Sequence, residues 1–268
     1  MELIGYVAAL FVGITLGLLG GGGSILTVPI FSYMFLLNPV TATAYSLFVV
    51  GVTALIGAIR NIQKGMVDFK IAFLFAVPAF IAVYLTRRYL IPAIPETIIE
   101  INQIVLTKDK GIMLVFSLIM LLASFSMIKR KSTISKKNDG LKLNLPLIVL
   151  EGGVVGVLTG IVGAGGGFLI IPALVLFAHM PMKKAVATSL LIIAMKSLIG
   201  FLGDIQNLKI DWTFLLSFTA ISIVGIFIGI YLNSFIDDKP LKKGFGWFVL
   251  IIAIYIIAKE LFCKSVFY

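Results

Sequence analysis

The chain has 268 residues, of which 60% are hydrophobic and 13% are charged, and its mean hydropathy is +1.13. Because a soluble domain carries about 25% charged residues, this composition excludes a soluble globular protein and predicts a polytopic membrane protein. Much of the net charge of +10 lies in one connector between apolar segments. We expect this basic connector to set the membrane topology or to bind anionic lipid headgroups. We expect no nucleic-acid partner.

Ten apolar segments follow along the chain in two sets of five. They cover approximately residues 3–19, 24–37, 40–60, 70–91 and 111–128, and then 145–162, 167–179, 182–203, 213–233 and 245–262. Most can cross a bilayer core of about 30 Å, which takes roughly 20 helical residues. The second segment of each set is short, and 24–37 would reach only about 21 Å as a helix. The first two segments of each set therefore form either a helical hairpin that dips into the membrane or two short tilted spans.

A glycine cluster precedes or opens each short segment. The first cluster comprises Gly20, Gly21, Gly22, Gly23 and Ser24, and the second comprises Gly163, Ala164, Gly165, Gly166 and Gly167. A glycine inside a helix costs about 1 kcal/mol relative to alanine, so we predict that a helix is broken at each cluster. Broken helices in membrane proteins usually line a cavity, because their freed backbone groups cannot face lipid.

The two sets of segments are copies of one sequence pattern. Gly17 matches Gly160, which lies 143 positions further on, and the same spacing pairs Pro29 with Pro172. It also pairs polar residues that apolar composition alone could not align, namely Ser46 with Ser189, Gln63 with Gln206 and Asp68 with Asp211. Each copy has an odd number of crossings under either reading of its first two segments. We therefore predict an all-α integral membrane protein made of two inverted-topology repeats of about five helical segments each.

Charged residues predict how these repeats are oriented. We divide the chain into a first membrane repeat over 1–128, a basic connector over 129–144 and a second membrane repeat over 145–268. The connector carries six Lys and Arg residues against one Asp, and the positive-inside rule places it in the cytoplasm of a multi-pass inner-membrane protein. Both termini then lie outside. Arg87 and Arg88 fit less well, because they fall at the non-cytoplasmic end of their segment.

The glycine clusters are candidate anion sites. Successive backbone N–H groups in a glycine-rich turn can point at one anion, and the helix that follows adds its N-terminal dipole. Ser24 could cap the first short helix or donate its hydroxyl to the anion. Hydroxyl groups of the third segments could also contact a substrate, and these are Ser46, Thr188 and Ser189. The alternative is that the glycines and hydroxyl groups serve only close helix packing.

Other polar residues have candidate roles outside the glycine clusters. Glu151 and Lys196 fall inside apolar segments, where they could form an ion pair, or Lys196 could attract an anion while Glu151 carries a coupling proton. Asp68 and Asp211 each precede a fourth segment, and we expect them to cap it. The chain has one cysteine and one histidine, which excludes an internal disulfide and a thiolate or histidine-cluster metal site. We expect no metal ion and no cofactor.

The run Gly17-Leu-Leu-Gly20-Gly-Gly-Gly-Ser24-Ile-Leu-Thr-Val-Pro29 and its copy from Gly160 to Pro172 resemble the signature of the TauE/SafE family of sulfite-exporter-like membrane proteins. The stretch from Ala187 to Leu190 and the pair Asp211-Trp212 match the family's later pattern. The resemblance implies an inner-membrane transporter of small anions, with sulfite, sulfoacetate and related sulfur-containing organic anions as proposed substrates. Lys196, Glu151 and the Tyr45/Thr188 difference between the repeats depart from that pattern.

Together these observations predict a secondary transporter, not an enzyme, that exports a small anion by alternating access around a site between the two glycine clusters. Its expected partners are the anion and the lipid bilayer, and the sequence is compatible with proton coupling and with a homodimer. Three alternatives stay open at this point: a passive anion channel, a membrane enzyme or assembly factor that handles a sulfur compound, and a structural or lipid-handling protein.

Overall fold

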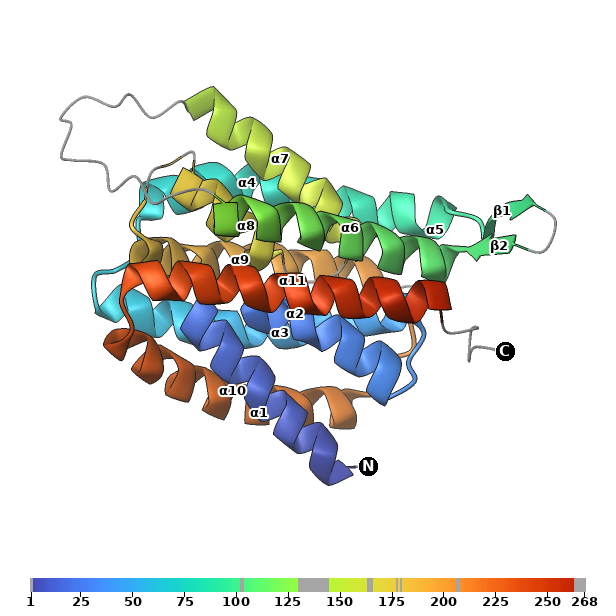
Figure 1. Ribbon diagram of the computed structural model, residues 1–268, viewed down its shortest axis with the longest axis horizontal. Helices are drawn as coiled ribbons and strands as arrows, with labels where there is room; N and C mark the ends of the chain where they lie inside the picture. The colour runs from blue at the N-terminus through green and yellow to red at the C-terminus, as the bar shows by residue number, and fades with distance from the viewer. Residues whose placement is uncertain are drawn as a thin grey trace.

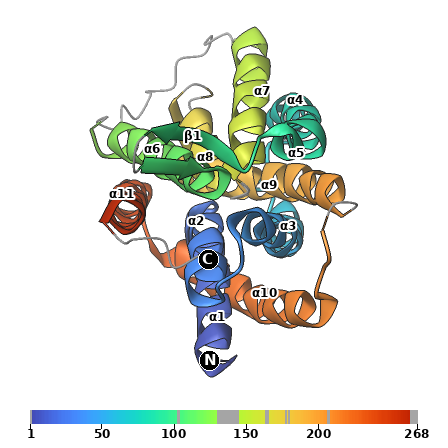
Figure 2. The ribbon, with the colours of Figure 1, turned by 90° about the vertical axis from the view of Figure 1, so that its right-hand side faces the viewer.

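The computed structural model describes residues 2–101, 104–129, 145–162, 166–176, 178, 180–205 and 208–262. This part of the chain is a bundle of helices with their long axes in roughly one direction and a short pair of strands at one end (Figure 1). Viewed along the helices, α3 (Pro39–Gln63) and α9 (Met182–Asp204) occupy the centre of the bundle (Figure 2). They are its most buried long helices, with 72% and 78% of their most apolar stretches buried.

The first half of the chain contains six helices, two π-helical turns and the two strands. In chain order these are α1 (Glu2–Leu19), α2 (Gly22–Pro29), η1 (Ile30–Met34), α3, α4 (Phe69–Leu85), η2 (Thr86–Leu90), α5 (Ile91–Ala93), β1 (Thr97–Ile101), β2 (Ile104–Thr107) and α6 (Lys108–Lys129). The second half contains α7 (Leu145–Val162), α8 (Gly167–Leu176), α9, α10 (Trp212–Phe235) and α11 (Asp238–Phe262).

All ten predicted segments are helical within a few residues of their expected bounds, which confirms the all-α membrane class. The antiparallel pair β1–β2 was not predicted. The start of α2 also differs, because the helix begins at Gly22 instead of after the glycine cluster. A Cβ on Gly23 would collide with the backbone of Val12 and the side chain of Leu16, so Gly23 lets α2 lie close against α1.

Capping of the fourth helices follows the prediction and ties the two halves together. The Asp68 carboxylate accepts a hydrogen bond from Ile71 N at 3.1 Å, and the Asp211 carboxylate accepts one from Phe214 N at 3.1 Å. The backbone N–H of each Asp also donates to a hydroxyl of the other half. Asp68 N lies 3.1 Å from Thr188 Oγ1, and Asp211 N lies 2.6 Å from Tyr45 OH. The Tyr45/Thr188 difference thus falls on two residues that make equivalent contacts.

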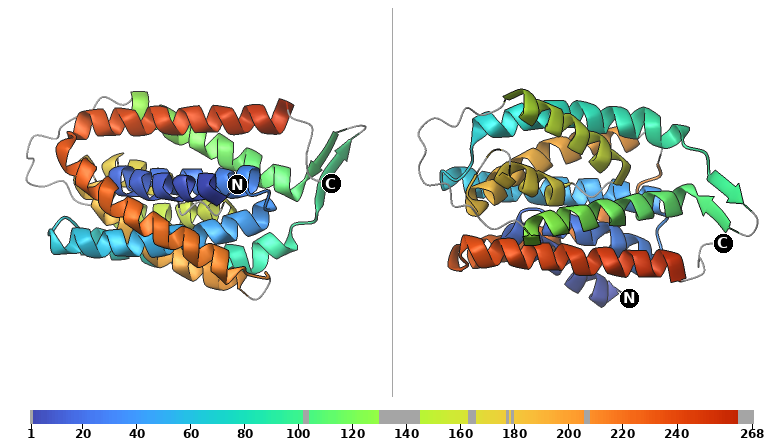
Figure 3. Two further views of the ribbon diagram at one scale, coloured as in Figure 1. Left: turned by 90° about the horizontal axis from the view of Figure 1, so that it is seen from below. Right: turned by 45° about the horizontal axis from the view of Figure 1, so that its top comes forward.

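The two halves pack reciprocally. α1 lies against α10 and α7 lies against α4, while α3 contacts α9 and α6 contacts α11 (Figures 2 and 3). If each helix is replaced by the helix at the same place in the order of the other half, with the three-residue α5 not counted, this list of pairs is unchanged. Small residues permit the close crossing of α1 and α10, since a Cβ on Gly13 or Gly17 would collide with the α10 backbone, and one on Gly225 or Gly229 with that of α1.

The first helices of the two halves, α1 and α7, begin near opposite ends of the bundle. α1 begins near the end of the bundle that carries β1–β2, and α2 turns back toward that end (Figures 1 and 3). α7 begins at the opposite end, where α4 also begins (Figure 1). α2 therefore runs back alongside α1, which both predicted arrangements of the first two segments require.

The outer surface suits a bilayer. Five helices within the described residues are long and apolar enough to cross a membrane, spanning Pro39–Gln63, Phe69–Ala93, Met182–Asp204, Trp212–Phe235 and Lys239–Glu260. Large apolar side chains face outward at helical spacing, as Phe73, Val77 and Ile81 do on α4. The protein is therefore a multi-pass membrane protein.

Candidate anion site between the helix breaks

The two helix breaks touch each other inside the bundle. Gly20 and Gly166, with φ of +69° and +67°, adopt the left-handed backbone that side chains disfavour. A Cβ added to Gly21 would collide with the backbone of Gly167, and a Cβ added to Gly167 would collide with that of Gly21. Residues from opposite halves of the chain therefore meet in backbone contact. We call Gly20, Gly21, Gly166 and Gly167 the glycine junction.

α9 runs along one side of this junction. A Cβ on Gly20 would lie 2.9 Å from both Ser189 Oγ and Val186 Cγ1. Further along α9, a Cβ on Gly167 would lie 2.7 Å from Ile193 Cδ1. The absence of side chains at the junction thus lets the two breaks fit against the most buried helix of the protein.

Lys196 places its side-chain nitrogen beside the junction. Its side chain is 0% exposed, and Nζ donates a hydrogen bond to Thr159 Oγ1 at 2.7 Å. A Cβ on Gly166 would lie 2.5 Å from the same Nζ, so the ammonium group sits directly against the turn that leads into α8. An ammonium group has three N–H donors, and Thr159 accepts from one of them. The ion pairs Arg87–Asp204 and Lys108–Glu96 do not involve Lys196.

Glu151 lies elsewhere. It is a partly exposed residue of α7, about two turns before Thr159 on the same helix. The predicted alternative of a Glu151–Lys196 ion pair therefore does not occur in the structure, since the Lys196 ammonium group bonds to Thr159.

The predicted hydroxyl residues have separate surroundings. Ser189 faces Gly20 and also donates to Val186 O at 2.8 Å within its own helix. Ser46 is buried on α3 and hydrogen-bonds to the hydroxyl of Thr27 on α2. The hydroxyl of Thr188 accepts the Asp68 N–H, as described above. Of the three, Ser189 is the one that the structure brings to the junction.

The remaining residues of the two glycine clusters are distributed as follows. Gly22, Gly23 and Ser24 lie in the first turn of α2, and the residue that caps this helix is Gly21. The prediction that Ser24 is the N-cap is therefore wrong, because Gly21, three residues earlier, holds that position. Gly163, Ala164 and Gly165 lie outside the described residues.

Sequence reasoning missed a buried ion pair near the end of the bundle at which α4 and α9 end. Arg87, in η2, is 0% exposed, and its Nη1 lies 3.4 Å from Asp204 Oδ2 and donates to Thr43 Oγ1 at 2.9 Å. Nε and Nη2 of Arg87 have no hydrogen-bond partner among the described residues. The available signal was the poor fit of Arg87 to the positive-inside rule, which is explained by its burial against an acidic residue.

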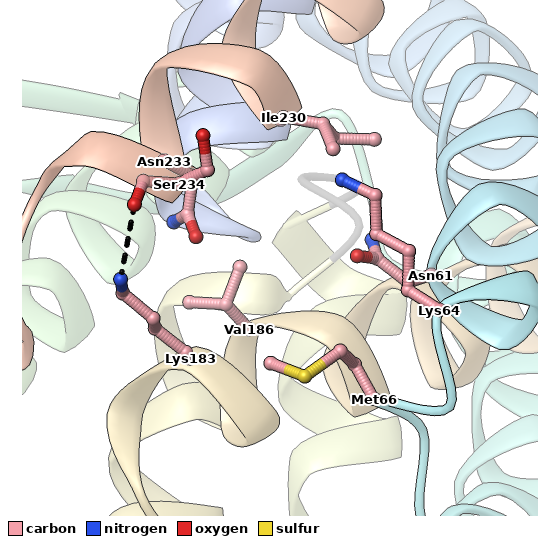
Figure 4. A pocket seen from close by; sticks show the side chains of 9 residues that line it. Asn61, Lys64, Met66, Lys183, Val186, Ile230, Asn233 and Ser234 are labelled. Atoms are coloured by element: carbon pink, nitrogen blue, oxygen red, sulfur yellow. Dashed lines mark hydrogen bonds between the residues drawn. The ribbon is translucent and has the colours of Figure 1, made fainter.

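The opposite end of the bundle holds a cavity of about 270 Å³ (Figure 4). Its walls include residues from α1, α3, α9 and α10 and from the turn after α3. Its polar lining residues are Asn61, Lys64, Lys183, Asn233 and Ser234. Val186 lies at the same cavity and also packs against Gly20 of the junction.

The chain matches a known membrane family over nearly its whole length. The family described as "Sulfite exporter TauE/SafE" matches residues 6–256. A "Probable membrane transporter protein" of Xylella fastidiosa is 30% identical over 252 residues, which are 92% of this chain and 91% of the relative.

Two further relatives carry similar descriptions. "Probable membrane transporter protein YunE" of Bacillus subtilis is 27% identical over 286 residues, covering 97% of each chain. A "Probable membrane transporter protein" of Methanocaldococcus jannaschii is 37% identical over 119 residues, or 42% of this chain and 45% of the relative. No solved structure matches the chain at a significant level. These descriptions name a transporter and none names an enzyme, which agrees with the multi-pass fold. The chain therefore belongs to the sulfite exporter TauE/SafE family and is a membrane transporter.

Proposed function

We propose that the protein is a secondary transporter that exports a small anion, either sulfite or a sulfur-containing organic anion such as sulfoacetate. The observation that carries this proposal is the meeting of two helix breaks at Gly21 and Gly167 beside the buried ammonium group of Lys196. The family supplies the substrate class and the direction, because it is described by sulfite export.

The chemistry at the junction favours an anion over a cation or a neutral solute. A lysine buried in a membrane protein without a carboxylate partner costs several kcal/mol, and a bound anion would offset part of this cost. The N-terminus of α8, where Leu169 N and Ile170 N donate to Gly166 O, carries the positive end of the helix dipole. In the proposed site, Lys196 and the N-terminus of α8 bind the anion, and the Ser189 hydroxyl turns away from Val186 O to donate to it.

Alternating access is the mechanism that we propose for this site. The reciprocal pairs α1–α10 and α7–α4, and the opposite ends at which α1 and α7 begin (Figure 1), support the inverted-repeat relation. In such transporters the two halves rock around a site between them. We place the connector 129–144 in the cytoplasm and both termini outside the inner membrane. Glu151 is our candidate to carry a coupling proton.

The test is transport by the purified protein in liposomes. We expect saturable uptake of radiolabelled sulfite that increases when the liposomes are preloaded with sulfite or sulfoacetate, and no increase with preloaded acetate. Flux that rises linearly with concentration and shows no such exchange would indicate a passive channel. If the protein is monodisperse and no sulfur-containing anion moves, the proposed function is wrong. An applied pH gradient that does not alter the flux would remove the role of Glu151.

A further inference from the structure

Arg87 has hydrogen-bond donors that the protein does not use. Its guanidinium group is fully buried and carries five N–H donors. Nη1 donates to Thr43 Oγ1, whereas Nε and Nη2 have no hydrogen-bond partner in the part of the chain that the structure describes. A buried donor without a partner is costly, and more so on a charged group. The edge of Arg87 formed by Nε and Nη2 therefore offers a fork of buried N–H donors to a ligand.

A donor fork of this kind selects oxyanions. Two parallel N–H bonds from one guanidinium edge bind two oxygens of the same carboxylate or phosphate group. Sulfite and sulfonate groups also carry several oxygens on one central atom, so two of these oxygens can accept from the fork. A lysine, in contrast, acts as a point charge. The free edge of Arg87 thus has the chemistry to recognise the same class of anion as the glycine junction.

Asp204 neutralises Arg87 without holding it tightly. Arg87 Nη1 and Asp204 Oδ2 are 3.4 Å apart, and Asp204 Oδ2 is buried without a hydrogen-bond partner among the described residues. A strong charge-assisted hydrogen bond would be about 2.8 Å long. The two side chains attract each other by charge but lack the bidentate contact that would fix them together. An oxyanion that reaches the free edge can therefore compete with Asp204 for the guanidinium group.

One face of α9 connects this cluster to the glycine junction. Lys196, Gly200 and Asp204 follow each other at intervals of four residues, so they lie on the same face of the helix. At 1.5 Å per residue, Lys196 and Asp204 are about 12 Å apart along the helix axis. Gly200 places no side chain between them on that face. Arg87 thus lies about two helical turns from Lys196, toward the end of the bundle that carries β1–β2 (Figure 1), which we place outside.

The repeat indicates how space forms beside Arg87. A shift of 143 positions converts three residues that line the cavity of about 270 Å³ into this cluster: Asn61 corresponds to Asp204, Val186 to Thr43 and Ile230 to Arg87. One end of the bundle is therefore open where the equivalent place at the other end is filled. Alternating access rocks one repeat against the other. In the opposite access state we expect the cavity to close and the equivalent space to open beside Arg87.

We propose that the Arg87 guanidinium group is a second anion site, on the outer side of the glycine junction, and that Asp204 is an internal competitor that the transported anion displaces. This inference rests on the proposed function, from which it takes the anion and its direction. The exported anion passes from Lys196 to Arg87. When it leaves, the Asp204 carboxylate returns to Arg87 and the site closes.

Thermal unfolding with an added anion tests binding at Arg87 without relying on transport. Lys196→Met removes the charge of the junction site and is the background for every variant in this test. In that background, Asp204→Asn removes the internal competitor. We expect saturating sodium sulfoacetate to raise the melting temperature of the Asp204→Asn protein at least three times as much as that of the Lys196→Met protein, because the anion replaces the lost carboxylate. Sodium chloride at the same ionic strength gives the baseline.

Two matched variants identify the group that binds. Arg87→Gln/Asp204→Asn keeps a neutral, hydrogen-bonding pair without the guanidinium group, so sulfoacetate should shift its melting temperature no more than sodium chloride does. Arg60→Gln/Asp204→Asn is the control, because Arg60 is an exposed arginine, and it should keep the full shift. A shift in the Asp204→Asn protein that survives the loss of Arg87, or that sodium chloride reproduces, would overturn the second anion site.

Exchange kinetics separate binding at Arg87 from a structural role. Arg87→Lys, made in the otherwise unaltered protein, keeps the positive charge beside Asp204 but removes the fork. In liposomes that contain the protein in one orientation, we expect it to raise the KM for sulfoacetate on the outer side at least fivefold and to leave the KM on the inner side within twofold. Arg60→Lys should change neither value. If Arg87→Lys lowers only the maximal rate, or alters both KM values equally, Arg87 has a structural role and the second site is wrong.

The two proposals fail separately. If the parent protein exchanges sulfite but the sulfoacetate shift does not depend on Arg87, the second site is wrong and the transport function stands. If the shift depends on Arg87 and no sulfur-containing anion is transported, Arg87 binds anions but the transporter assignment on which this inference rests fails.

Discussion

Asp204→Asn removes the charge that neutralises Arg87 while it keeps the size and shape of the side chain. Arg87 is fully buried, and its Nη1 contacts Asp204 and Thr43. Removing one member of a buried ion pair costs about 3–5 kcal/mol, because the other charge stays buried without a partner. The Arg87–Asp204 distance of 3.4 Å is longer than the about 2.8 Å of a strong charge-assisted hydrogen bond. We therefore expect a loss at the lower end, about 3 kcal/mol.

The matching double variant removes both charges. Arg87→Leu/Asp204→Leu avoids the cost of burying charge, and replacing a buried pair by apolar residues is often neutral or stabilising. We expect its stability to lie within about 1 kcal/mol of the parent protein.

Thermal unfolding in detergent provides the measurement. A loss of 1 kcal/mol lowers the melting temperature of a chain of this size by about 2–4 °C, so Asp204→Asn should lower it by about 6–12 °C. Asp237→Asn is the control, because Asp237 is exposed and asparagine caps a helix as well as aspartate does. If Asp204→Asn melts with the parent protein, or if the double variant is as unstable as Asp204→Asn, the reasoning about a buried charge pair is refuted.

Three further substitutions test the packing. Gly20→Ala should lower the melting temperature more than Gly65→Ala. Both glycines have positive φ, which costs alanine about 1–2 kcal/mol at either position. A Cβ on Gly20 would also press against Ser189 and Val186, whereas a Cβ on Gly65 meets nothing within 4 Å among the described residues. Equal losses would contradict a close-packed junction. Gly225→Leu should prevent α1 from packing on α10 and abolish the monodisperse peak in size-exclusion chromatography, and an unchanged peak would contradict that helix crossing. Asp211→Ala should cost about 1 kcal/mol through loss of the cap, and an unaltered melting temperature would show that the cap contributes nothing.

Features that depend on local or periodic patterns could be predicted from the sequence. The apolar segments follow from the length of an apolar run, and the two caps follow from an aspartate just before such a run. The duplication follows from a constant spacing that includes polar residues such as Asp68 and Asp211. The glycine clusters marked the positions of the two helix breaks, although packing against α1 allows α2 to begin at Gly22, where helix propensity alone predicts a break.

Features that depend on contacts between distant segments could not be predicted. The backbone contact of Gly21 with Gly167 and the bond from Lys196 to Thr159 join different helices, and no local pattern pairs them. Glu151 was the obvious acidic partner for Lys196 by composition, but it lies about two turns from Thr159 along α7. Arg87 was visible only as an exception to a charge rule. The β1–β2 hairpin was missed because it falls in a short stretch that was treated only as a link between apolar segments.

The central claim is that a buried lysine beside the glycine junction binds the transported anion. Sulfite exchange by Lys196→Met in liposomes tests it most directly, with Lys184→Gln as the exposed control. Methionine fills a similar volume without charge, so the variant should fold at least as well as the parent protein while its sulfite exchange falls at least tenfold. Unchanged exchange by a monodisperse Lys196→Met protein would contradict the account, because the anion would then bind without the charge on which the proposed site depends.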